Sequence, residues 1–210
     1  MTWMNDVLRD FIDDFVFVYL DDILIYSRNV SEHVNHVDRV LQRLSSLDLK
    51  LKASKCFLAL HELTFLGHIV SSNGIRPDPS KAQAVLDWPL PSSLQEIRSF
   101  LGFVNYYRKF IPNFATIAAP LVALTSTTSP QCGVMNDSAA SSFKALKLCL
   151  SQAPTLAFPH VSSDAEFVLD TDASDVGIGY VLHRLQDGCL RPLSYGARTL
   201  NRHERNYSVQ

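Results

Sequence analysis

Two adjacent aspartates, Asp21 and Asp22, are the feature that most constrains this chain. They lie between the apolar runs 15–18 and 23–26. Such runs predict two short strands, which puts the acids at or near a hairpin turn. Successive strand side chains point to opposite faces, but at a turn both carboxylates can converge. An acidic pair walled by apolar strands costs free energy unless a cation compensates it, and Mg²⁺ with oxygen ligands is the natural candidate.

A second acidic string has the same character. Asp170 and Asp172 lie on or just beyond an apolar strand, and Gly177 and Gly179 allow the next strand to return tightly. Alternation places both aspartates on one face, so that one could bind metal while the other supports it. Each acidic string also has a simpler interpretation. The first could be a solvated turn, because Asp is common in turns, and the second could be a polar strand end.

Composition limits the class of protein. The chain has 210 residues, 47% of them hydrophobic and 19% charged, which is typical of a globular protein with one large or two small domains. Its formal charge of −2 favours no nucleic-acid partner by itself. However, an acidic start (residues 1–30) precedes a mildly basic stretch (31–125), which suits a metal site beside a polyanion-binding surface.

The sequence also predicts the compartment. Four cysteines are scattered without a C-x-x-C pair, which favours reduced thiols over a disulfide scaffold or a zinc site. No apolar stretch is long enough to span a bilayer, and the N-terminus lacks the pattern of a secretion signal. We therefore expect an intracellular protein, cytoplasmic or nuclear, with no membrane segment.

Hydrophobic periodicity and turn signals predict the order of elements. Helices are expected over 4–14, from Asn29 or Ser31 to 47, over 79–87, from Ser93 through 101, over 140–150 and from Arg202. Strands are expected over 49–57, 63–70, 167–169, 177–182 and 192–195. Residues 125–136 are rich in Ser, Thr and Pro, which is typical of a linker. His33 and His36 have no partner at a recognisable metal-ligand spacing, so they are interpreted as surface histidines.

Two further strings could contact nucleic acid. Residues 65–68 are expected in the middle of a strand, where Gly67 gives either close core packing or close approach of a ligand. Residues 100–111 interleave aromatic side chains with Arg108 and Lys109, which can stack bases and hold phosphates. The same string could equally form a helix that packs its rings inward.

Taken together, these strings resemble one family. Residues 17–27 resemble the catalytic hairpin of reverse transcriptases from gypsy-type LTR retrotransposons. The similarity continues through 32–34, 55–56, 65–70, 88–89 and 100–111. Residues 167–182 and 204–209 resemble the opening of the ribonuclease H domain in the same polyproteins. The strings occur in the family's order and extend over nearly the whole chain.

The resemblance implies a fold and an activity. The fold class would be α+β: a partial reverse-transcriptase palm (1–76), a helical thumb (77–125), a linker or connection (126–163) and the N-terminal strands of a ribonuclease H-like α/β domain (164–210). The activity would be RNA-directed DNA polymerisation coupled to ribonuclease H cleavage, by two-metal phosphoryl transfer. The partners would be an RNA/DNA template-primer, deoxynucleoside triphosphates and the rest of the polyprotein.

The resemblance also assigns residues. Asp21 and Asp22 would help hold two Mg²⁺ ions in the polymerase site of the full-length enzyme, and Asp172 would be the first metal-binding aspartate of ribonuclease H. Tyr19 would lie under the primer terminus. The primer grip would be formed by four consecutive residues, Phe65, Leu66, Gly67 and His68.

The family pattern has parts that this sequence lacks. The polymerase site uses a further aspartate and nucleotide-binding fingers from upstream, and the next ribonuclease H carboxylate is expected just after Val209. Around residues 131–136, Gly133 and Met135 stand where the family usually shows an aromatic-x-Trp motif. We therefore expect the isolated 210 residues neither to extend a primer nor to cleave a hybrid. The alternatives are a non-catalytic nucleic-acid-binding fragment and a degenerate remnant of an element.

Overall fold

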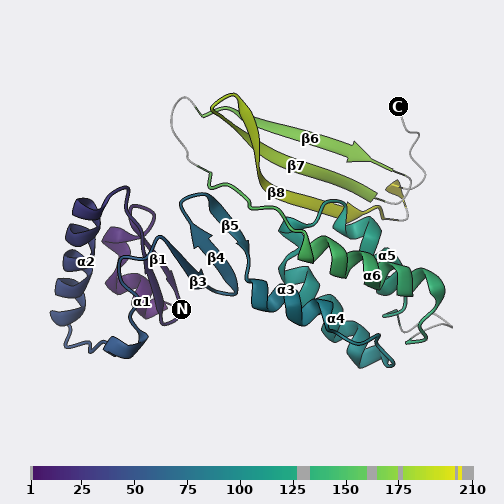
Figure 1. Cartoon of the computed structure of the whole chain (residues 1–210), viewed down its shortest axis with the longest axis horizontal. Coiled ribbons are helices and arrows are strands. Elements are labelled where there is room, and N and C mark those ends of the chain that lie inside the picture. Colours follow the sequence, from purple (N-terminus) through teal and green to yellow (C-terminus); the bar gives the residue numbers. More distant parts are fainter. Residues whose placement is uncertain (1, 127–132, 160–164, 175–176, 202, 205–210) are drawn as a thin grey trace. The chain divides into compact units, whose positions relative to one another are not determined.

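The computed structural model describes residues 2–126, 133–159, 165–174, 177–201 and 203–204 (Figure 1). The chain divides into two compact units, residues 1–61 and 62–210. This division falls inside the segment predicted as palm, and the bounds of the four predicted domains stay predictions. No helix in the described ranges is long and apolar enough to cross a membrane.

The first unit contains the predicted acidic hairpin. Its elements are α1 (Thr2–Val7), η1 (Arg9–Phe11), β1 (Val16–Tyr19), β2 (Asp22–Ile25), α2 (Val30–Ser45) and η2 (Ala53–Lys55). The predicted helix over 4–14 is wrong in extent, because α1 ends at Val7 and Asp13 adopts a left-handed φ of 67°. A helix cannot continue through that conformation. The buried side chains are Val7, Leu8, Phe11, Phe15, Val16, Val40 and Leu44.

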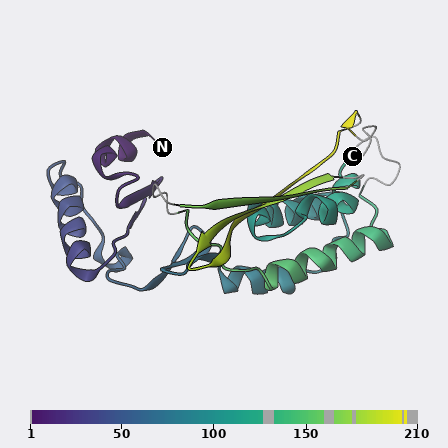
Figure 2. The ribbon, with the colours of Figure 1, turned by 90° about the horizontal axis from the view of Figure 1, so that it is seen from above.

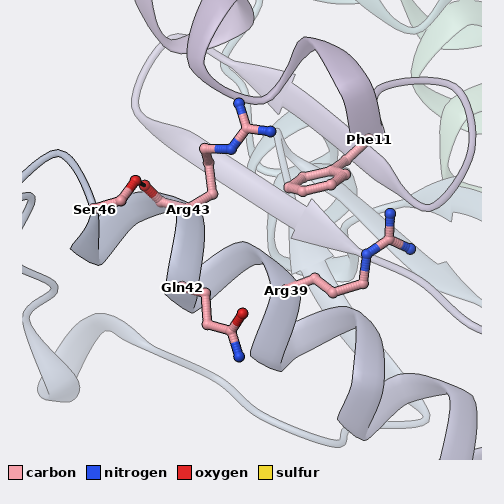
Figure 3. A pocket seen from close by; sticks show the side chains of 5 residues that line it. All are labelled: Phe11, Arg39, Gln42, Arg43 and Ser46. Atoms are coloured by element: carbon pink, nitrogen blue, oxygen red, sulfur yellow. Dashed lines mark hydrogen bonds between the residues drawn. The ribbon is translucent and has the colours of Figure 1, made fainter.

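Helix α2 begins where the sequence predicted. The Asn29 side chain accepts the backbone N–H of Glu32 at 2.9 Å, and the Glu32 carboxylate accepts the N–H of Arg28 at 2.8 Å. The Arg39 guanidinium lies 4.9 Å from the ring centroid of Phe11, and Figure 3 shows this ring between the two arginines of α2. Arg43 also pairs with Asp10 at 2.6 Å. These cations therefore pack α2 against η1, beside a shallow hollow of about 360 Å³.

Two strand predictions are wrong. Residues 49–57 contain only the short helix η2, because no strand of the first unit pairs with them in the described residues. Residues 63–70 form two strands instead of one, β3 (Glu62–Phe65) and β4 (His68–Ser71). Leu66 and Gly67 between them have φ of 48° and 71°, as a type I′ hairpin turn requires. The unpredicted strand β5 (Gly74–Pro77) completes an antiparallel sheet.

The helices of the second unit follow their capping signals. Asp78 caps α3 (Pro79–Leu86), Ser93 caps α4 (Leu94–Tyr106) and Asn136 caps α6 (Asp137–Ser151). Between them lie η3 (Arg108–Phe110) and α5 (Phe114–Ala123). Their shared core contains Phe100, whose ring lies 4.4 Å from that of Phe143. Most aromatic rings of residues 100–111 pack inward, which favours the second of the two interpretations of that string.

A three-stranded antiparallel sheet follows the helices. It is formed by β6 (Phe167–Ala173), β7 (Gly177–Gln186) and β8 (Cys189–Thr199), with β7 in the centre. All three strands were predicted, and all are longer than predicted. Strands β7 and β8 contact α5 (Figures 1 and 2). Most of the predicted helix from Arg202, and residues 127–132 of the predicted linker, fall outside the described residues.

The segment at Leu156 and Ala157 joins the β3–β4–β5 sheet to the β6–β7–β8 sheet. The backbone of Leu156 exchanges two hydrogen bonds of 2.8 Å with Ile75 of β5, and Ala157 donates to the carbonyl of Pro192 in β8 at 2.8 Å. A Cβ on Gly74 would lie 2.0 Å from the Leu156 carbonyl oxygen. Only glycine therefore permits this close approach of two backbones.

Candidate functional site

Asp21 and Asp22 lie at the end of the β1–β2 hairpin. Tyr19 and Asp22 form the last strand pair, so Leu20 and Asp21 are the two turn residues. Leu20 has a φ of 54°, which costs a leucine about 1–2 kcal/mol and is imposed by the strand pairing on both sides. Both aspartates are exposed. The strands thus hold two carboxylates at a fixed, solvent-accessible point.

Within the described part of the chain, the two carboxylates have no cationic partner. None of the ion pairs among the described residues includes Asp21 or Asp22. Carboxylate oxygens are the ligands that Mg²⁺ prefers, so this pair fits part of a magnesium shell. However, no cluster of three or more potential ligands occurs in the described ranges. The chain as described therefore offers a partial shell.

The predicted primer-grip string forms a hairpin turn. Two tyrosines hold this turn: Tyr106, the last residue of α4, and Tyr107, the C-cap of that helix. The Tyr106 hydroxyl donates to the Leu66 carbonyl at 2.6 Å, and the Tyr107 hydroxyl donates to the Gly67 carbonyl at 3.0 Å. A Cβ on Gly67 would lie 2.9 Å from the Tyr107 hydroxyl oxygen. Burial raises the pKa of Tyr107 to about 12, so its hydroxyl keeps its proton and remains a donor. Sequence reasoning missed this contact, although the two tyrosines were visible in the sequence.

His68 lies behind this turn. Its side chain is buried, and its Nδ1 lies 2.8 Å from the Leu66 carbonyl, to which it donates. The ring packs on Tyr106, Tyr107 and Phe110 with centroids 5.3–5.5 Å apart. Burial lowers the pKa of His68, and the nearby Lys109 ammonium lowers it further, so the neutral imidazole is favoured. Within this unit His68 supports the turn, and its predicted contact with nucleic acid stays a prediction.

The second acidic string lies on β6. Asp172 is exposed and faces Gly179 across the strands. The Asp170 carboxylate lies 3.1 Å from Nδ1 of His183 on the neighbouring strand, an ion pair when the imidazole is protonated. Asp170 lies on the same face of β6 as Asp172 and is paired with His183. This position suits a residue that supports Asp172. The catalytic and metal-binding roles of these aspartates stay predictions.

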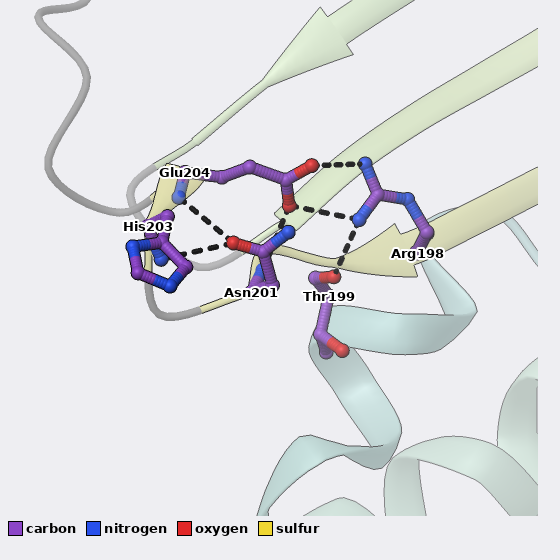
Figure 4. Close-up of polar contacts among 5 residues, drawn as sticks. All are labelled: Arg198, Thr199, Asn201, His203 and Glu204. Carbon is purple, nitrogen blue, oxygen red and sulfur yellow. Dashed lines mark hydrogen bonds and ion pairs between the residues drawn. The ribbon is translucent and has the colours of Figure 1, made fainter.

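Beyond the last strand, a polar network fixes the chain (Figure 4). The two guanidinium nitrogens of Arg198 contact the Glu204 carboxylate at 2.8 and 3.0 Å, and the Asn201 backbone N–H donates to the same carboxylate at 2.8 Å. The Arg198 hydrogen bonds lower the pKa of Glu204 to about 2. The carboxylate is therefore ionised at neutral pH and neutralises Arg198. No sequence signal singled out this pair.

His33 and His36 differ from the surface histidines that the sequence predicted. Both are half-buried, and their Nδ1 atoms lie 3.2 and 2.8 Å from the Ser27 hydroxyl oxygen. His36 also stacks on Phe15 with ring centroids 3.8 Å apart. They join α2 to Ser27, which follows β2 at the open end of the hairpin, opposite the aspartates.

Family models match the two segments of the chain that contain the acidic hairpin and the acidic strand β6. Residues 1–70 match reverse transcriptase (RNA-dependent DNA polymerase), and residues 135–210 match an RNase H-like domain found in reverse transcriptase. The chain thus resembles the reverse transcriptase and RNase H-like region of retrotransposon Pol polyproteins. It is 41% identical over 206 residues to the Pol polyprotein of transposon 297 and 36% identical over 216 residues to that of transposon gypsy, both from Drosophila melanogaster. Each alignment covers 98% of this chain but only 19% and 20% of the relative, so the chain spans about a fifth of those Pol polyproteins.

Solved structures share the fold. A foamy viral protease-reverse transcriptase in complex with double-stranded DNA superposes with a TM-score of 0.83 at 24% identity, covering 98% of this chain and 35% of that one. The same viral protein with an RNA/DNA hybrid gives a TM-score of 0.79, covering 98% and 27%. The α+β fold predicted from the family resemblance is thereby confirmed.

Proposed function

We propose that this chain supplies part of the polymerase site and part of the ribonuclease H site of a retrotransposon reverse transcriptase. One observation carries the proposal most directly. An exposed carboxylate pair, without an ion-pair partner among the described residues, occupies a rigid hairpin end inside the segment that matches the reverse transcriptase family. The substrates would be an RNA/DNA template-primer and deoxynucleoside triphosphates, and the partner would be the remainder of a Pol polyprotein.

In the polymerase reaction Asp21 and Asp22 would hold Mg²⁺. The bound ions would neutralise phosphate charge and activate the attacking hydroxyl. The chain's own contribution is position: the β1–β2 pairing fixes both carboxylates, and Tyr19, 42% exposed, precedes the turn. The Leu66–Gly67 turn is fixed in the same way by its tyrosine contacts, which suits a backbone that supports a primer end.

In the ribonuclease H reaction Asp172 would be a metal ligand. Its strand pairs with β7 along its whole length, so the position of the carboxylate is set by a sheet rather than a loop. Asp170 would play a supporting role, and its own negative charge is offset by His183 when that imidazole is protonated. The exposed position of Asp172 leaves its oxygens accessible to an ion and to a phosphate.

A non-catalytic nucleic-acid-binding role is the second candidate. It is favoured by one observation, that the described residues bring no three metal ligands together. This role would need only the basic surface of the helical segment and no divalent ion.

RNA-templated primer extension separates the two roles. A Pol polyprotein that carries residues 1–210 is expected to extend a DNA primer on an RNA template with Mg²⁺, and EDTA is expected to abolish the extension while the enzyme stays bound to the template-primer. Binding without any extension, with or without Mg²⁺, would support the non-catalytic role instead.

A further inference from the structure

A groove of about 340 Å³ lies between η3 and the strands β7 and β8 of the second unit. Its lining residues are mainly basic, aromatic or small: Arg108, Lys109, Ile178, Tyr180, Ser194, Tyr195, Gly196, Ala197 and Arg198. None of these described lining residues is acidic. The groove is separate from Asp172, because that aspartate pairs with Gly179 and the next residue, Tyr180, points to the opposite face of the sheet.

The basic side chains of the groove differ in whether a carboxylate neutralises their charge. Arg198 is neutralised by Glu204, as described above. Lys109 is half-buried and forms no ion pair with any residue that the structure describes, and its Nζ lies 5.2 Å from the Phe110 ring centroid. Because the side chain is half-buried, its ammonium has lost part of its hydration, and this burial lowers the pKa of Lys109. Arg108 beside it is exposed and also lacks a carboxylate partner among the described residues. A partly desolvated cation of this kind is stabilised by a bound anion.

Tyr180 gives the groove a flat apolar wall. It pairs with Gly196 across the strands, and a Cβ on Gly196 would lie 2.1 Å from the Tyr180 ring. The ring therefore lies against the bare backbone of β8, and a residue with a Cβ at position 196 would force the ring to move. The Tyr180 side chain is still 48% exposed. Such an exposed, supported ring is the arrangement on which nucleic-acid bases stack.

We propose that this groove binds single-stranded nucleic acid, with a backbone phosphate at Arg108 and Lys109 and a base stacked on Tyr180. Cations alone would suit any anion, including an acidic peptide. The supported tyrosine ring beside them favours a ligand that carries both a phosphate and a planar base. The ligand class rests on the proposed nucleic-acid function, but the groove uses none of the aspartates of either catalytic site.

Binding of a fluorescent oligothymidylate to the purified 210-residue chain, followed by anisotropy without divalent metal, tests the groove. Arg108→Gln with Lys109→Gln is expected to weaken binding at least about tenfold and to lower the slope of log K against log salt by roughly 1. Tyr180→Ala is expected to weaken it by roughly 5- to 100-fold, whereas Tyr180→Phe, which keeps the ring, binds like the parent. Lys144→Gln on the exposed face of α6 is the matched control and should change nothing.

The proposal is overturned if the groove variants bind like the parent chain, or if Tyr180→Ala binds as well as Tyr180→Phe. Competition by polyglutamate as strong as that by unlabelled oligothymidylate would also overturn it, because the groove would then be a general anion site. The binding assay contains no metal and no nucleotide. A negative result in it therefore does not bear on the primer-extension experiment. Circular dichroism of each variant confirms that it is folded.

Discussion

Replacing Asp21 with asparagine in a Pol polyprotein that carries this chain is expected to lower primer extension on the order of 10²- to 10³-fold. The change removes one negative charge from the hairpin end and keeps the size of the side chain. Asp21 and Asp22 form no ion pair among the described residues, so the loss of charge should disturb metal binding and little else. The measurement is the initial rate of nucleotide incorporation at saturating Mg²⁺.

The matched control is Asp13→Asn in the same unit. Asp13 is also exposed, and its left-handed φ of 67° suits asparagine at least as well as aspartate. Extension by this control should stay within about threefold of the parent, since the effect of a single charge at a solvent-exposed site is small and screened by salt. Equal losses in both variants would show that general surface charge, and not the hairpin pair, controls the rate.

Replacing Phe100 with alanine is expected to lower the free energy of unfolding of the second unit by about 3–5 kcal/mol. The Phe100 ring is fully buried and lies 4.4 Å from the Phe143 ring and 5.8 Å from the Trp88 ring. Its removal leaves a cavity where α4 and α6 meet. Urea unfolding followed by tryptophan fluorescence measures the change, because Trp88 belongs to the same cluster.

Phe167→Ala is the comparison for that stability measurement. Phe167 opens β6 and is 41% exposed, so its truncation is expected to cost about 1 kcal/mol or less. If the two variants were destabilised equally, the packing of residues 100–111 described above would be wrong.

Local signals predicted the elements whose stability is local. The capping side chains Asn29, Asp78 and Ser93 each accept a backbone N–H at the predicted helix start. The acidic hairpin was equally visible, because two apolar runs with a polar break define its register. Helix caps and hairpin turns depend on residues close together in the sequence, so they can be predicted from the sequence alone.

The errors concern contacts between distant residues. The Leu66–Gly67 turn was hidden inside an apolar run, and its tyrosine partners lie 40 residues away. Strand β5 pairs locally with β4, but its other edge is bound by Leu156, which lies far along the chain in a segment without periodicity. The groove near Tyr180 likewise combines η3 with β7 and β8. The candidate aspartates could be named from the sequence, whereas their partners, such as His183 for Asp170, required the fold.

Asp21 and Asp172 are proposed to belong to two different catalytic sites carried by one chain. Cleavage of an RNA/DNA hybrid and primer extension, assayed on one preparation of the Asp172→Asn polyprotein, test this proposal most directly. We expect hybrid cleavage to fall on the order of 10²- to 10³-fold and extension to stay within about threefold of the parent, because Asp172 lies on the sheet of the RNase H-like segment and outside the hairpin. Unchanged cleavage, or an equal loss of both activities, would contradict the assignment of Asp172.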